Sequence, residues 1–143
     1  MPVICVTELK STCPIVLNKY HMSFVPAVLV TAGIAVLSLT ESTHMPSVSV
    51  NDKLVHGVMY AVLAVAWLVP IGLRTRLRVR TYLYVCVGAT LYGLLMEVLQ
   101  RFCTMTRSGN MADLLADFIG AITGVALVAM LKWLNAKKMV NGK

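Results

Sequence analysis

Four long stretches of the chain consist almost entirely of apolar residues, and short polar segments separate them. They run over residues 24–40, 54–73, 81–100 and 114–134. A helix needs about twenty apolar residues to span the hydrocarbon core of a membrane. None of the stretches shows the polar–apolar alternation of a barrel strand, and backbone polar groups in lipid must be bonded internally. The pattern therefore predicts an all-α polytopic membrane protein, a bundle of four transmembrane helices.

The composition of the chain agrees with this prediction. Of its 143 residues, 58% are hydrophobic and only 13% are charged, and the mean hydropathy is +0.78. An ordinary soluble domain carries roughly 25% charged residues, and a domain of this size keeps much of its surface in water. A soluble enzyme, a disordered tail and a disulfide scaffold are therefore all disfavoured.

The first apolar stretch has a second interpretation, as a cleaved signal peptide. It is short for a span unless residues 20–23 extend it, but it starts only after a mostly polar segment. No clear small-x-small cleavage site follows it. We therefore expect this stretch to be retained as the first transmembrane helix.

The distribution of basic residues predicts how the helices are oriented, because cytoplasmic loops hold the excess of Lys and Arg. With four spans, one side of the membrane receives ten of the thirteen basic residues: Lys10, Lys19, Arg74, Arg76, Arg78, Arg80, Lys132, Lys137, Lys138 and Lys143. The other side keeps Lys53, Arg101 and Arg107. We therefore expect both termini to be cytoplasmic, with residues 1–22 as an N-terminal segment, 23–134 as the transmembrane domain and 135–143 as a basic tail.

The net charge of +7 could also suggest a nucleic-acid partner. The basic residues lie in short segments next to the predicted spans, without interleaved aromatic residues, and attraction to anionic lipids explains them. We therefore expect membrane lipids, and no nucleic acid, as partners.

The four cysteines show no CxxC pair and no metal-ligand spacing. On the predicted topology, Cys5 and Cys13 lie in the reducing cytoplasm, Cys86 lies within a helix, and only Cys103 lies near the outer face. We therefore expect no intramolecular disulfide. We also expect neither a bound metal nor a cofactor.

Acidic residues gather on the predicted outer side. Four of the six acids lie at the ends of predicted spans or inside them: Asp52, Glu97, Asp113 and Asp117. Charged groups at membrane depth are costly, and they usually face the interior of a bundle and mark function. The start of the second span, the end of the third and the start of the fourth should therefore converge on one polar layer.

The spacing of these polar residues places several of them on shared helix faces. Asp52, His56 and Tyr60 follow one another at intervals of four, and Glu97 and Gln100 are three apart. The predicted outer-face polar site comprises Asp52, Lys53, His56, Tyr60, Glu97, Gln100, Arg107, Asp113 and Asp117.

Gly120 and Gly124 form a GxxxG motif in the last stretch. Such motifs let two membrane helices approach closely. We favour packing within the bundle over a face for a second copy of the chain, and a homo-oligomer remains an open alternative.

Several of these residues also form an ordered set of motifs. DKLVH at 52–56 is followed by Tyr60, then by EVLQ at 97–100, Arg107, and DLLADFIG at 113–120. Over residues 51–124 the chain resembles the VanZ-like family, the family of a glycopeptide accessory-resistance protein linked to teicoplanin. The family's pattern usually has Asn where this chain has Asp117. The resemblance implies a multi-pass protein of the bacterial cytoplasmic membrane, with a role at the cell envelope and in the antibiotic response.

Three interpretations of the polar site remain open. The charges could form an ion-pair network that only holds the helices together. Lys53, His56 and Arg107 could instead bind an anionic, lipid-linked cell-envelope precursor, because Arg suits bidentate phosphate contacts. In an enzyme, His56 and Glu97 would supply acid–base chemistry, with a divalent ion held by Asp52, Asp113 or Asp117. The sequence contains no nucleophile motif or metal-binding motif that would indicate a reaction class. Binding is therefore the function that we expect.

Overall fold

The computed structural model describes residues 23–40, 51–103 and 111–141, and these ranges contain four α-helices. The helices are α2 (Val25–Leu39), α3 (Asn51–Arg74), α4 (Val79–Cys103) and α5 (Met111–Asn141). The prediction of an all-α fold with four helices is confirmed. Three segments are long and apolar enough to cross a membrane: Lys53–Arg74, Val79–Phe102 and Met111–Val140.

Helix α2 is apolar but shorter than the other three. Its 15 residues span about 22 Å at 1.5 Å per residue, compared with a hydrocarbon thickness of about 30 Å. Two hydrogen bonds attach its middle to the bundle. The indole nitrogen of Trp67 in α3 donates to the Thr31 hydroxyl at 3.2 Å, and the Tyr92 hydroxyl in α4 donates to the Thr31 carbonyl at 2.6 Å.

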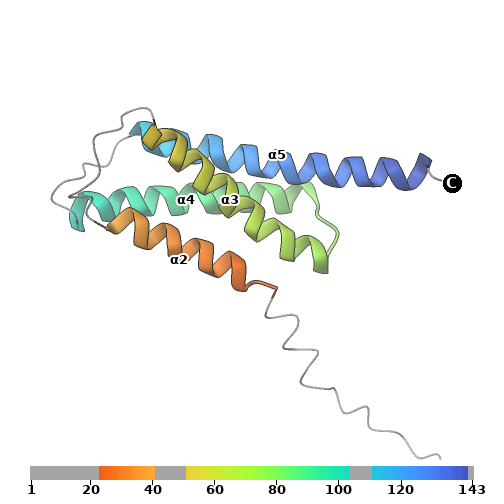
Figure 1. The fold of residues 1–143 in the computed structure, drawn as a ribbon, viewed down its shortest axis with the longest axis horizontal. Helices are drawn as coiled ribbons and strands as arrows, with labels where there is room; N and C mark the ends of the chain where they lie inside the picture. Colours follow the sequence, from red (N-terminus) through yellow and green to blue (C-terminus); the bar gives the residue numbers. More distant parts are fainter. Residues whose placement is uncertain (1–22, 41–50, 104–110, 142–143) are drawn as a thin grey trace, which may run out of the picture.

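Consecutive helices run in opposite directions (Figure 1). The largest interface is between α3 and α5, while α2 packs on α3 and α4 on the side away from α5. The last part of α5 continues beyond the other helices. The start of α2 and the end of α5 therefore lie at the same end of the bundle.

The close packing of α3 on α5 depends on glycine. A Cβ atom at Gly120 would overlap the carbonyl oxygen of Gly57, and one at Gly124 would overlap that of Ala61. Small residues of this kind let helix backbones approach in a membrane, where no hydrophobic effect drives helices together. The GxxxG motif of α5 thus faces α3 within the chain.

The outside of the bundle is apolar. On α4, for example, Leu83, Val87 and Leu91 repeat every four residues and are each more than half exposed. The buried apolar centre is small and includes Ile34, Leu63 and Ala121. This arrangement suits a bundle whose surroundings are lipid tails, which are as apolar as leucine.

Charge divides the bundle into two ends. The acidic end is the end at which α3 and α5 begin and α2 and α4 finish, and it carries Glu97, Asp113 and Asp117. The basic end lies opposite and carries Arg74, Arg76, Arg78, Arg80 and Lys132. The positive-inside rule predicts that the basic end faces the cytoplasm.

This orientation can be tested by labelling single cysteines in a cysteine-free background. A cysteine at Arg78, in the α3–α4 turn, should react with a membrane-impermeant reagent only after the cells are opened. A cysteine at Phe102, which is 82% exposed at the acidic end, should react in intact cells. The reverse labelling pattern would overturn the orientation.

Candidate functional site

The centre of the site is a buried pair formed by His56 of α3 and Asp117 of α5. The Nδ1 atom of His56 lies 3.0 Å from Oδ1 of Asp117. His56 is 8% exposed and Asp117 only 1%. A hydrogen on Nδ1 donates to the carboxylate, which places the lone pair of a neutral ring on Nε2. The pair therefore fixes the orientation of the imidazole and supplies the carboxylate with a donor.

Asp117 is also enclosed by α4. A Cβ atom at Gly93 would lie 2.7 Å from Oδ2 of Asp117, so the carboxylate occupies the space that a larger residue at Gly93 would need. Three helices therefore meet at this side chain: His56 belongs to α3, Gly93 to α4 and Asp117 to α5. The absence of a side chain at Gly93 makes room for the acid.

Further polar side chains are buried near this pair. Glu97 and Gln100 of α4 and Tyr60 of α3 are all buried, and Tyr60 lies within electrostatic reach of Asp117 and Glu97. The Gln100 amide donates to the backbone carbonyl of Ser38 in α2 at 2.9 Å. We name this set the polar layer: Ser38, His56, Tyr60, Glu97, Gln100 and Asp117.

The hydroxyl of Tyr60 has an unusual position within the polar layer. It is buried and has no hydrogen-bond partner among the residues that the structure describes. A buried donor left without a partner costs about 1–3 kcal/mol. Its ring packs against Tyr92, with the ring centroids 6.3 Å apart, so the hydroxyl is held in place by packing.

Lys53 and Asp113 lie nearer the surface of the acidic end. Their side chains form an ion pair between α3 and α5, with Nζ 3.4 Å from Oδ1. The Lys53 side chain is 47% exposed and that of Asp113 18%. A partly exposed pair of this kind contributes about 0.2–1 kcal/mol. The pair therefore forms a polar rim that costs little to open.

The predicted site residues fall into three groups. His56, Tyr60, Glu97, Gln100 and Asp117 belong to the polar layer, and Lys53 and Asp113 form the rim. Arg107 and the side chain of Asp52 lie outside the described residues. The interfacial glycines Gly120 and Gly124 lie deeper along α5, against α3.

The sequence predicted α2 as a transmembrane helix but gave it no part in the polar site, although its buried Ser38 carbonyl accepts the Gln100 amide. No side chain in the sequence signals this contact, because the acceptor is a backbone oxygen. Gly57 was also missed, although its backbone is the surface on which Gly120 packs. Within the described ranges, no group of three His, Cys, Asp or Glu side chains is arranged to hold a metal ion.

The fold and the site together define a multi-pass α-helical membrane protein with a polar layer buried near one end of its bundle. A family model described as VanZ/LLP1 matches residues 3–132, so the chain belongs to the VanZ/LLP1 family. The resemblance inferred from the motifs is thereby confirmed. No curated protein and no solved structure matches the chain.

Proposed function

We propose that the protein binds the headgroup of an anionic, lipid-linked component of the bacterial cell envelope at its acidic end. The observation that carries the proposal is the polar layer itself, which three membrane-spanning helices and α2 build beneath an exposed lysine. Apolar packing would hold these helices together at lower cost, and polar residues at membrane depth usually mark a functional site.

The rim is the part of the site suited to an anion. Lys53 has three N–H donors, and its contact with Asp113 is long and partly exposed. Because this ion pair is weak, a phosphate could replace Asp113 as the partner of Lys53 at little cost. Arg107, six residues before Asp113 in the sequence, is the second cation that we expect there.

The polar layer beneath the rim favours a different part of the ligand. Glu97 and Asp117 make it acidic, so a phosphate would be repelled from it. Hydroxyl or amide groups are the better partners for carboxylates, for the His56 ring and for the Tyr60 hydroxyl. A headgroup that combines a phosphate with neutral polar groups therefore suits both the rim and the polar layer. The resemblance to glycopeptide accessory-resistance proteins favours a cell-envelope precursor.

The proposal predicts that Lys53→Gln weakens retention of the ligand. A hydrogen bond to a charged group contributes about 1.5–3 kcal/mol, which corresponds to a loss of about 10- to 150-fold in affinity. Native mass spectrometry of protein purified in mild detergent should detect a polyprenyl-phosphate-linked species on the parent and little of it on the variant.

Lys138→Gln provides the control, since it removes the same charge from the exposed end of α5. Equal loss in the two variants would attribute retention to net charge alone. A parent protein that carries no such species would contradict the proposal.

The His56–Asp117 pair also favours a second candidate function, a membrane-embedded enzyme that acts on a lipid or envelope precursor. A carboxylate bonded to Nδ1 orients the ring so that Nε2 can accept a proton, as a general base must. This function would appear in the same experiment as a change in the mass of an added precursor, rather than as retention alone.

A further inference from the structure

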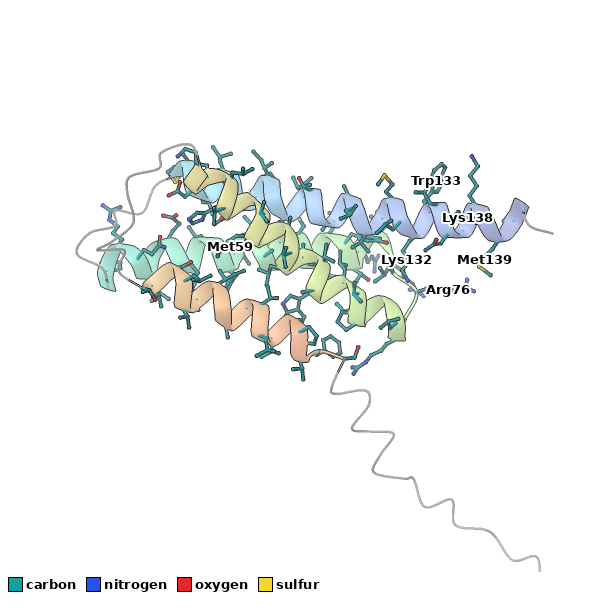
Figure 2. All side chains as sticks on the ribbon, in the orientation of Figure 1. Met59, Arg76, Lys132, Trp133, Lys138 and Met139 are labelled. Carbon is teal, nitrogen blue, oxygen red and sulfur yellow. The ribbon has the colours of Figure 1, made fainter. Side chains whose placement is uncertain are left out.

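A polar pocket lies at the basic end, at the opposite end of α3 and α4 from the polar layer. Its volume is about 500 Å³, and it is bounded by the end of α3, the α3–α4 turn, the start of α4 and the side of α5. The polar residues that line it are Arg74, Thr75, Arg76, Tyr82 and Lys132. Figure 2 shows Lys132 beneath α5 and Arg76 beside it at the turn.

The pocket concentrates positive charge. Three cationic side chains line it and no acidic residue does. The acids whose side chains the structure describes, Glu97, Asp113 and Asp117, all belong to the acidic end. Like charges held in one pocket repel one another, so an anion bound among them would be stabilised by all three.

Two of the cations are held in place by contacts with the protein. The Lys132 ammonium donates to the backbone carbonyl of Gly72 at 3.3 Å, near the negative end of the α3 dipole. This bond uses one of its three donors. The Arg74 guanidinium lies 4.3 Å from the centre of the Phe24 ring, a cation–π contact. Preorganised cations lose less side-chain entropy when they bind an anion.

The position of the pocket selects a lipid rather than a soluble ligand. One membrane-spanning segment ends at Arg74 and the next begins at Val79, so the pocket lies at the level of lipid headgroups. Leu73 and Leu77 line it, and Leu73 is 75% exposed, which leaves an apolar surface for acyl chains. Basic pockets between membrane helices on the cytoplasmic side are suited to anionic headgroups.

We propose that this pocket binds the phosphate of an anionic membrane lipid headgroup. The inference is independent of the ligand at the acidic end, because it uses different residues at the opposite end of the helices. It also differs from general attraction between basic loops and lipid, since it requires the three cations that line the pocket and not the exposed lysines farther along α5.

The test measures phosphatidylglycerol retained by purified protein after exchange into detergent, again by native mass spectrometry. Arg76→Gln and Lys132→Gln should each reduce retention by about five- to tenfold, while Lys138→Gln, outside the pocket, should not. Phosphatidylcholine should be retained weakly by all four proteins. Arg76 is exposed, so its replacement should leave the thermal stability of the protein unchanged.

Equal retention by Arg76→Gln, Lys132→Gln and Lys138→Gln would overturn the proposal in favour of diffuse attraction. Millimolar inorganic phosphate serves as a second arm: displacement of the lipid by phosphate alone would make the pocket a site for soluble phosphate instead. Arg76→Gln should still retain the polyprenyl-phosphate species expected at the acidic end, which separates the two sites.

Discussion

Replacing His56 by leucine should lower the free energy of unfolding by about 3–5 kcal/mol, because it leaves the Asp117 carboxylate buried without its charge partner. Asp117→Leu should also be destabilising, by about 1–3 kcal/mol, since it removes the hydrogen-bond partner of a buried histidine. Denaturation in detergent, followed by circular dichroism, measures both. A clear loss of stability in both variants is the expected result.

Asp117→Asn is the matched control for this prediction. The amide keeps an oxygen that can accept from His56 Nδ1 and changes only the charge, so we expect it to be tolerated far better than leucine. Asn is also the residue that the motif of the resembled family usually has there. In the double variant His56→Leu/Asp117→Asn neither position of the pair carries a charge, and part of the lost stability should return. If His56→Leu had no effect on stability, the pair would not be buried as described.

Gly120→Ala should also be strongly destabilising, although it adds only one methyl group. The new Cβ would overlap the Gly57 carbonyl oxygen, which is backbone and cannot move without separating α3 from α5. Overpacking of this kind typically costs about 1–3 kcal/mol. The same denaturation measurement applies, and the loss should be accompanied by weaker ligand retention, because α3 and α5 carry His56 and Asp117.

Gly88→Ala is the control, since a Cβ there meets nothing within 4 Å. Alanine favours a helix over glycine by about 0.8–1 kcal/mol, so this variant should be as stable as the parent or slightly more stable. Similar effects at the two glycines would contradict the close α3–α5 contact.

The helices could be predicted from the sequence because each coincides with a continuous stretch of apolar residues. The first prediction, residues 24–40, differs from α2 (Val25–Leu39) by one residue at each end. The fourth ended at 134, whereas α5 continues to Asn141. Residues 135–141 contain no proline or glycine and consist mostly of residues that are compatible with a helix, so nothing local stops it before Gly142.

The sequence predicted which residues belong to the polar site, but it did not predict which of them contact one another. Spacing places His56 and Tyr60 on one face of α3, but it does not say which acid that face meets. The structure pairs His56 with Asp117 and Lys53 with Asp113. That choice depends on how α3 and α5 are rotated and aligned, and their alignment is fixed by the backbone contact between Gly57 and Gly120.

The hydrogen bond by which α2 joins the polar layer could not be predicted from the sequence either. Gln100 bonds the Ser38 carbonyl, and any residue at that position would present the same backbone oxygen. The contact therefore depends on where α2 lies in the bundle, and the side chain at 38 does not specify it. Thr31, whose carbonyl accepts from Tyr92, is a second case of the same kind.

We propose that the polar layer serves a ligand and does more than hold the helices together. The double variant His56→Leu/Asp117→Leu tests it most directly, because replacing a buried pair by apolar residues of similar size often leaves stability unchanged or raises it. Native mass spectrometry would compare the polyprenyl-phosphate species retained by this variant and by the parent. We predict a folded variant that retains little of the ligand. A folded variant with undiminished retention would contradict the claim and make the layer a structural network.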